Sequence, residues 1–456
     1  MKVTAGGKDT VGDMQRVVQS IPSSYTVWKD GTQAIAESNV KGGTDYTTGT
    51  DAVVIQNAID AVAALGGGKI LIRQGIYDIT AALAITTDGI IVEGEGSNRK
   101  QVYYGSAPSP LARITGGTVL KVTTASINCF EVSGHIFGLA IRHLAIDFTQ
   151  AATGHAITCS VTNTVGISEF CFEDIFVNNT DGGHYALRME NAALGTVTGL
   201  TSFGGPLLEL VSEPTAIGVF YCGNVVYTEV TGWICKTLSN HAVYVHRNGG
   251  TGYVNLNEFN RLFVILDPAG SMSTFGALWC EYMFHSLFNM LNIEVWGYGA
   301  PTDSVHLAEV HDTTFINPYV MYFLNNCWMA WTDCDGIRVF GGNLDVDVAD
   351  RTVKDTWFGV GISHINVNHL AKLERCFVWD LVSSSWLPTE NNGTSTGTGA
   401  QQEIDHGCGF TPTTANVILT DLESGAAAYC SAAPTSEHIY VTATNNQDYR
   451  WEVKYS

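Results

Sequence analysis

The chain has 456 residues and a formal net charge of −21, and 45% of its residues are hydrophobic. The hydrophobic fraction excludes wholesale disorder, and the sparse, scattered lysines and arginines exclude the basic stripe that a nucleic-acid partner requires. The same charge favours a neutral glycan over a strongly anionic polymer. No apolar run of about 18 residues is present, so we expect no membrane insertion, and the first residues lack the hydrophobic stretch of a secretory signal.

The chain begins with a Gly-, Thr- and Asp-rich stretch, residues 1–50, for which we expect an irregular lead-in or attachment segment. A helix is predicted directly after it, because Asp51 can cap its first turn and Gly66 can end it. The apolar residues between these two positions recur with helical spacing and are Ile55, Ile59, Val62 and Leu65.

From Lys69 to about Leu387 the sequence consists of short segments in which Val, Ile, Phe or Leu alternate with polar residues between Gly, Asn or Asp. Blocks that can be aligned begin near Ala242, Gly276, His306, Ala330 and Gly359. Irregular coils of this length are typical of a parallel β-helix, in which each coil buries its apolar side only against its neighbours. The sequence therefore predicts an all-β solenoid over 51–387, with the helix covering its open end.

Residues 388–402 are polar and of low complexity, and they are predicted to be a linker. Residues 403–456 return to strand-like alternation and predict a separate small all-β module. The chain has 11 cysteines without a CxxC or a regular spacing, so we expect buried free thiols at positions such as Cys159, Cys171, Cys222, Cys235 and Cys280.

The segment DAVVIQNAIDAVAALGGGKILIRQGIYDI, followed by GIIVEGEG, resembles the N-terminal signature of the pectate-lyase-like family. The resemblance covers about residues 45–97 and implies a right-handed parallel β-helix. The family includes polygalacturonase-like hydrolases, polysaccharide lyases, mannuronan epimerases and phage tailspikes. The signature builds the cap and first coils, so it specifies the fold and not the chemistry. The hydrolase GHG and RIK motifs and the epimerase DPHE motif are absent, and no catalytic set of the family transfers to this chain.

A second segment, which runs from His406-Gly407-Cys408-Gly409 to Tyr449-Arg450-Trp451, looks like a small β module of viral and archaeal proteins. This resemblance implies a homotrimer and a place in a virion tail or on an extracellular surface.

Coil stacking suggests where a site would form, because adjacent coils lie about 4.8 Å apart and equivalent positions form a column. The alignment of the blocks places one set of chemistry-bearing residues near one column: Arg247, Glu281, His311, Asp333 and His364. Glu281 and Asp333, two coils apart, would meet the carboxyl spacing of about 6.5–9.5 Å that inverting glycosidases use. The alternative is that both are solvated surface residues.

Three aromatic residues close to this pair would desolvate an acid and stack on sugar rings. They are Trp279, Tyr282 and Trp331. With Arg247, His311 and His364 they form the predicted substrate-binding set. In the alternative interpretation the aromatic residues belong to the core.

Asp345 and Asp347 alternate on one strand and so point to one face. Oxygen-rich clusters can hold Ca²⁺, and a loop of solvated carboxylates is the alternative. No other cofactor is predicted, because the chain has no P-loop, no dinucleotide fingerprint and no HExxH pair.

These features predict a glycan-engaging viral tailspike or tail fibre, which would depolymerise a host surface polysaccharide by glycoside hydrolysis if it is catalytic. Two other functions remain open at this point: a non-catalytic receptor-binding or structural spike, and a cellular polysaccharide lyase or epimerase.

Overall fold

The structure is a computed structural model with two compact units, Met1–Tyr282 with Asn292–Pro301 and Met283–Leu291 with Thr302–Ser456. No helix in the part of the chain that the structure describes is long and apolar enough to cross a membrane. The described residues are 23–97, 99–100, 113–114, 116–149, 154–160, 166–178, 183–212, 221–234, 240–248, 253–266, 276–295, 303–322, 328–332, 334–340, 344–348, 352–354, 357–358, 362–367, 372–374, 377–380, 385–388, 390–396, 400–405, 417–421, 428–435, 438–443 and 448–454.

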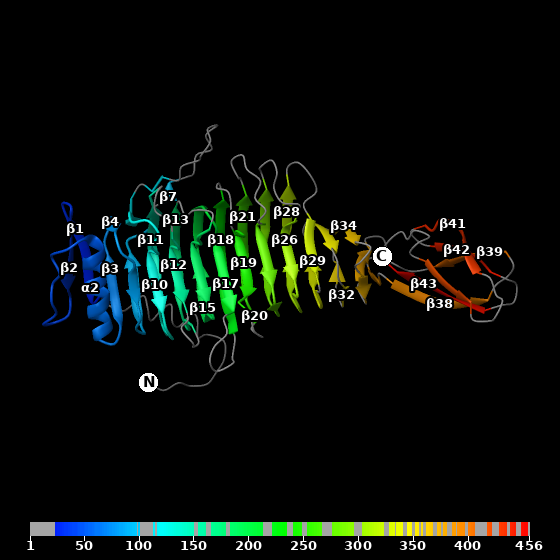
Figure 1. Ribbon diagram of the computed structural model, residues 1–456, viewed down its shortest axis with the longest axis horizontal. Helices are drawn as coiled ribbons and strands as arrows, with labels where there is room; N and C mark the ends of the chain where they lie inside the picture. The colour runs from blue at the N-terminus through cyan, green and yellow to red at the C-terminus, as the bar shows by residue number, and fades with distance from the viewer. Residues whose placement is uncertain are drawn as a thin grey trace. The chain divides into compact units, whose positions relative to one another are not determined.

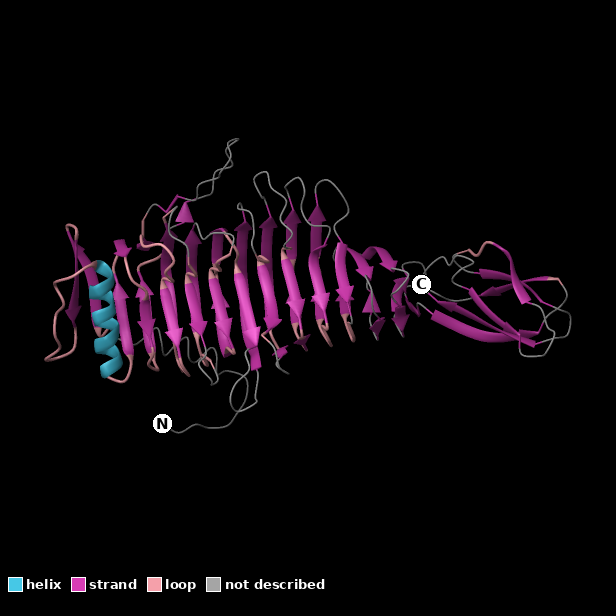
Figure 2. Ribbon diagram, viewed as in Figure 1, coloured by secondary structure: helices cyan, strands magenta, loops and turns pink. Residues whose placement is uncertain are grey.

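In the first unit, strands from successive coils pair in parallel and build two long sheets of a right-handed parallel β-helix (Figures 1 and 2). The first sheet contains β3 (Gly68–Ile72), β4 (Gly75–Ile79), β6 (Ile90–Gly94), β9 (Thr118–Val122), β11 (Ala140–Phe148), β13 (Cys171–Asn178), β15 (Ala193–Thr198), β16 (Thr201–Gly204), β18 (Tyr221–Ile234), β20 (Tyr253–Asn255), β21 (Glu258–Leu266) and β25 (Asn292–Val295). The second sheet contains β5 (Leu83–Ile85), β10 (Phe130–Ser133), β12 (Ile157–Ser160), β14 (Leu187–Glu190), β17 (Leu208–Ser212), β19 (Val243–Arg247) and β22 (Leu278–Glu281). A short antiparallel pair, β7 (Arg99–Lys100) and β8 (Arg113–Ile114), lies outside both sheets.

The second unit repeats the parallel pairing. One group comprises β23 (Met283–Phe284), β24 (Leu287–Asn289), β27 (Thr314–Ile316), β28 (Tyr319–Tyr322), β30 (Arg338–Phe340), β33 (Trp357–Phe358), β36 (Phe377–Asp380) and β37 (Ser385–Pro388), the last of which pairs antiparallel with β36. A second group comprises β26 (Asp303–Ala308), β29 (Trp328–Thr332), β31 (Leu344–Val348) and β34 (Ile362–Val367), and β32 (Thr352–Lys354) pairs with β35 (Lys372–Glu374). The predicted β-helix is confirmed.

The core of the first unit is a ladder of inward side chains, because parallel registration places one apolar residue of each coil over the next. All members are buried, and they run in register as Ile70, Val92, Ile141, Phe172, Val197, Tyr227 and Phe259. The Tyr227 and Phe259 rings are stacked with centroids 4.5 Å apart. In the second unit, Phe288 and Phe315 stack in the same way at 4.9 Å. The described cysteines Cys159 and Cys280 are buried free thiols, as expected, and Cys171 is half-buried.

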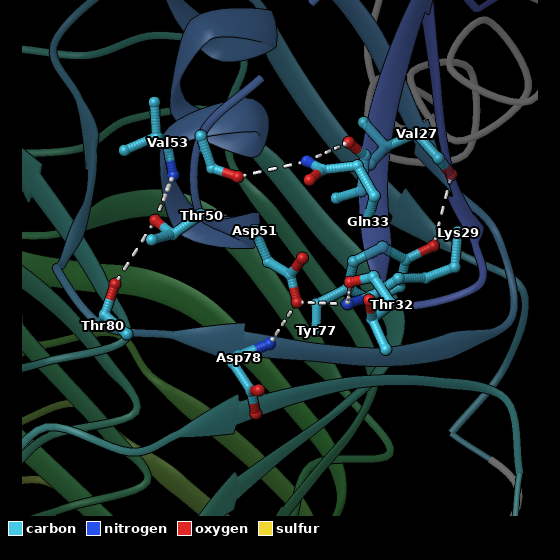
Figure 3. A network of polar contacts seen from close by, with 12 residues as sticks. Val27, Lys29, Thr32, Gln33, Thr50, Asp51, Val53, Tyr77, Asp78 and Thr80 are labelled. Atoms are coloured by element: carbon cyan, nitrogen blue, oxygen red, sulfur yellow. Dashed lines mark hydrogen bonds and ion pairs between the residues drawn. The ribbon is translucent and has the colours of Figure 1, made fainter. Parts of the chain in front are cut away.

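The helix α2 (Asp51–Ala64) covers the first coils, as predicted, but its N-cap is Thr50, whose side chain accepts a hydrogen bond from the Val53 amide. Asp51 instead binds the neighbouring strands (Figure 3). Its carboxylate accepts hydrogen bonds from the Lys29 ammonium and from the Asp78 amide, the latter at 2.7 Å. The buried Asp51 carboxylate therefore attaches the first turn of the helix to the neighbouring strands.

Gln56 completes the cap, because its side-chain amide pairs with the backbone of Ala84 as a neighbouring strand would. The Ala84 amide donates to Gln56 Oε1 at 2.7 Å, and Gln56 Nε2 donates to the Ala84 carbonyl at 3.1 Å. The helix thus satisfies backbone groups on the edge strand β5 that the coil leaves unpaired.

Two predicted boundaries are wrong. Residues 1–50 contain an ordered hairpin, β1 (Tyr25–Asp30) and β2 (Gln33–Ser38), and β1 also pairs in parallel with β3. The predicted linker 388–402 contains β38 (Glu390–Thr396), which pairs with β43 (Asp448–Lys454), and the start of β39 (Gln401–Asp405). β38 and β39 are polar on their own, and each gains an antiparallel partner from a distant part of the sequence.

The small C-terminal module consists of two antiparallel sheets, which contain β38, β43 and β40 (Val417–Asp421) in one and β39, β42 (His438–Ala443) and β41 (Ala428–Ala432) in the other. Its buried core is made of Ile439, Val441, Trp451 and Val453.

Candidate functional site

The predicted catalytic residue Glu281 lies at the end of β22, beside the predicted sugar-stacking residue Trp279. Both side chains are half-buried and alternate with the inward, buried Leu278 and Cys280. The indole Nε1 of Trp279 donates a hydrogen bond of 2.6 Å to Glu281 Oε1. The structure therefore brings these two residues together on the outer face of the second sheet.

Arg247 and Glu281 lie in the predicted column to within one residue. Tyr244 of β19 faces Trp279 and Val245 faces Cys280, so Arg247 lies level with Tyr282. The Arg247 guanidinium lies over the Tyr282 ring, with Cζ 3.2 Å from the ring centroid. Both residues belong to the predicted substrate-binding set, and their contact is a cation–π interaction.

His311 lies in a different column from the predicted one. Within the second unit it bridges Phe284 on one side and Asp335 on the other, and its ring stacks on Phe284 with centroids 4.8 Å apart. Asp333 lies outside the described residues, so its pairing with Glu281 stays a prediction.

For the other predicted residues the structure describes the backbone alone. Trp331 of β29 faces Val348 of β31, and Asp345 of β31 faces His364 of β34. Asp347 faces Asn366. The Ca²⁺ site stays a prediction; within the described ranges there is no cluster of three or more metal-ligating side chains.

The structure adds outward residues that the sequence interpretation missed. Register places Arg188 of β14, Glu209 of β17, Tyr244 of β19 and Trp279 of β22 in one row. We name the row and its polar neighbours the Trp279 strip, which consists of Arg188, Glu190, Glu209, Tyr244, His246, Trp279 and Glu281. Each member alternates with buried aliphatic residues in its own strand, and only the parallel register shows that they adjoin.

An ion network occupies one end of the strip. Arg188 Nε donates to Glu209 Oε2 at 2.6 Å, Arg188 Nη1 binds the Glu190 carboxylate, and His246 Nε2 lies 3.1 Å from Glu209 Oε1. Burial of Glu209 raises the pKa of its carboxyl group, but the His246 hydrogen bond and the Arg188 charge outweigh burial and hold this pKa below its ordinary value. Glu209 is therefore a carboxylate at neutral pH, suited to accept hydrogen bonds but not to donate a proton.

Aromatic rings occupy the other end. Tyr244 and His246 stack with centroids 3.8 Å apart, and His241 lies 4.5 Å from the Trp279 ring. Burial, together with the charges of Glu281 and Glu209, raises the pKa of Tyr244 to about 12, so its hydroxyl stays neutral. Ring faces, neutral hydroxyl groups and fixed carboxylates in one row are suited to the apolar faces and hydroxyl edges of a sugar.

No protein-family model matches the chain, and no curated protein matches it. Among solved structures, it is similar to a tailspike protein, gp49, from Acinetobacter baumannii bacteriophage Fri1, a capsular polysaccharide depolymerase, with 10% identity, coverage of 88% of this chain and 82% of that chain, and a TM-score of 0.40. It is also similar to a tailspike mutant of E. coli bacteriophage HK620 in complex with a pentasaccharide, with 10% identity, coverage of 97% and 99%, and a TM-score of 0.40.

A third similar structure is the A-module of the mannuronan C-5 epimerase AlgE6 of Azotobacter vinelandii, with 13% identity, coverage of 72% of this chain and 96% of that chain, and a TM-score of 0.32. At these identities and TM-scores the three similarities give no information about the activity of this chain.

Proposed function

We propose that this chain is a glycan-engaging protein of the tailspike or tail-fibre type, which binds a host surface polysaccharide along the Trp279 strip. The observation that carries the proposal is the single row of rings and fixed carboxylates on the outer face of the second sheet. Adjacent strands in this row are about 4.8 Å apart, so an extended sugar chain that crosses β14, β17, β19 and β22 meets a new side chain at every coil.

The strip also bears on catalysis. Glycoside hydrolysis breaks the bond between the anomeric carbon and the bridging oxygen: an acid protonates the leaving oxygen, while a base takes a proton from the water that attacks the carbon. We propose Glu281 and Asp333 as this pair. Glu209 cannot be the acid, because Arg188 and His246 keep it ionised.

The contacts of Glu209 favour a second candidate, binding without cleavage, since the most buried carboxylate of the strip is already bound by Arg188 and His246. We propose further that the chain acts as a homotrimer in a virion tail. Light scattering of the purified chain would give its molar mass, and a monomeric or dimeric mass would contradict the trimer.

The test of the function is a panel of bacterial surface polysaccharides incubated with the purified chain. Trp279→Ala should weaken polysaccharide binding by up to about tenfold, because it removes a ring contact that contributes about 0.5–1.5 kcal/mol. Trp279→Phe keeps a ring and should retain most of the affinity. Binding is measured by retention on immobilised polysaccharide, and equal affinity of the alanine variant and the wild type would contradict the site.

Cleavage is followed separately by the chain length of the polysaccharide and by the ultraviolet absorbance of an unsaturated product. Shortening without new absorbance indicates a hydrolase, and Glu281→Gln should then abolish it. Shortening with new absorbance indicates a lyase. Binding without shortening would identify a non-catalytic spike.

A further inference from the structure

A second row of residues lies on the first sheet, at the bend that each coil makes there. Arg142 faces Glu173 and Leu144 faces Ile175, so His143 lies beside Asp174, and the next registers continue the row. In order the row is His143, Asp174, Gly199, Glu229 and Arg261. All five residues have a left-handed backbone, with φ between +47° and +67°.

The charges along this row are symmetric about Gly199. On one side His143 Nδ1 lies 3.5 Å from Asp174 Oδ2, and on the other Arg261 Nη1 lies 2.7 Å from Glu229 Oε1. The Asp174 hydrogen bond and nearby carboxylates raise the pKa of His143, which favours its charged form. The sequence of charges is therefore positive, negative, none, negative, positive.

The neutral central position is not forced by the backbone. Left-handed φ values favour glycine, but the four neighbours adopt the same conformation with full side chains. The missing side chain of Gly199 instead leaves space between two carboxylates that are two strands apart, about 9.6 Å at the usual strand spacing.

This space is a groove of about 610 Å³, which lies within the range of small-ligand sites. Four members of the row, Asp174, Gly199, Glu229 and Arg261, line it. The other lining residues are Glu173, Thr198, Thr231 and Phe263, whose ring is half-buried. We propose that the Gly199 groove binds an amine-bearing sugar, whose protonated amino group lies between Asp174 and Glu229. The cation completes the alternation of charge along the row, and Phe263 supplies a ring face for the sugar or its ammonium group.

The groove is suited to binding and not to cleavage. Both flanking carboxylates have cationic partners on the side away from Gly199, so neither is arranged to act as a general acid. The site is also distinct from the Trp279 strip, which lies on the second sheet, and its ligand does not depend on the function proposed for that strip.

Isothermal titration calorimetry of the full chain with glucosamine, N-acetylglucosamine and glucuronate tests the proposal. Glucosamine should bind saturably, N-acetylglucosamine about tenfold more weakly because its nitrogen is uncharged, and glucuronate not at all. Higher salt should weaken glucosamine binding, since the carboxylates are partly exposed. Equal binding of the first two sugars, or no saturable binding of glucosamine, would overturn the proposal.

Gly199→Asn fills the groove with a residue that tolerates a left-handed φ, and it should abolish glucosamine binding. Gly66→Asn is the matched control, because Gly66 has φ +80° and a Cβ there meets nothing within 4 Å.

Glu229→Gln, at an exposed position, is a second variant that does not threaten folding and should weaken binding about tenfold. Undiminished binding by both groove variants would place the ligand elsewhere. Gly66→Asn should leave glucosamine binding unchanged.

Discussion

Glu209 shows how a buried charge on the outer face of the sheet is held. The carboxylate is almost inaccessible to solvent, and it has two side-chain partners on different strands, the Arg188 guanidinium on β14 and the His246 imidazole on β19. An unpaired charge at this depth would be strongly destabilising. The network therefore links three consecutive coils and fixes the position of the strip.

Glu209→Gln should lower the free energy of unfolding at pH 7 by about 2 kcal/mol, because it replaces charge-assisted hydrogen bonds with neutral ones. The pKa of Glu209 is lower in the folded chain than its ordinary value, so its stabilisation is complete above the unfolded pKa and is lost as pH falls through the folded pKa. Denaturant unfolding between pH 7 and pH 3 measures this.

The wild type should lose more stability than the glutamine variant over that acidic range, so the two curves converge. Glu131→Gln, at an exposed position of β10, is the control and should change stability by about 0.5 kcal/mol or less. Parallel curves for the wild type and Glu209→Gln would show that the carboxylate has no such role.

The bends of the coil are the elements that set register, and they carry strain. Leu194 and Leu256 have φ of +55° and +54°, which costs an L-residue about 1 kcal/mol or more. Both side chains are about half exposed, at 53% and 47%, so burial offsets little of this cost. A leucine at such a bend stabilises neither the local backbone nor the core.

Leu194→Gly should therefore raise the free energy of unfolding by about 0.5 kcal/mol, as relief of the left-handed strain exceeds the entropy that glycine adds to the unfolded chain. Ala84→Gly, at an exposed and extended position of β5, is the opposite control and should lower it by about 0.5–1 kcal/mol. Urea unfolding measures both. A loss of stability in Leu194→Gly would show that this leucine makes a contact that matters more than its strain.

The same bends explain what sequence could and could not predict. The periodicity of Ile55, Ile59 and Val62 predicts α2, and alternation predicts the strands, because each pattern is local. Register depends on the number of residues in each bend, and left-handed residues such as Tyr282 or Glu229 are not recognisable in a sequence. Arg247 lies one residue from the level of Glu281 for this reason. The strip members on β14, β17 and β19 were missed for the same reason, since they come from separate strands.

At the scale of the whole molecule, the net charge of −21 fits a ligand that is neutral or cationic. Both proposed sites contain more carboxylates than cations among their described residues. Long-range repulsion should slow the approach of an anionic polysaccharide at low salt more than that of a neutral one. The net charge of the whole chain therefore favours neutral over anionic glycans, as the carboxylates of the two sites do.

The cap gives a prediction for the stability of the first unit as a whole. Gln56→Ala removes both hydrogen bonds to Ala84 and leaves backbone groups of β5 without the partner that α2 provides. We expect a loss of about 1–2 kcal/mol in the free energy of unfolding. Gln56→Glu should lose at least as much, because its second oxygen would lie against the Ala84 carbonyl and against Asp60, to which Gln56 Nε2 also donates at 2.8 Å. Full stability of Gln56→Ala in urea unfolding would show that the pairing contributes nothing.

The arrangement of Gln56 against β5 has a consequence for assembly. A parallel coil is a template that can be copied strand upon strand, and its first rung presents backbone groups to any extended peptide in solution. The side-chain amide of Gln56 pairs with the backbone of Ala84 as a further strand would, and this prevents the addition of a peptide strand there. Variants that lose Gln56 should thus be prone to end-to-end polymerisation, with the intact coils stacked into filaments of native subunits.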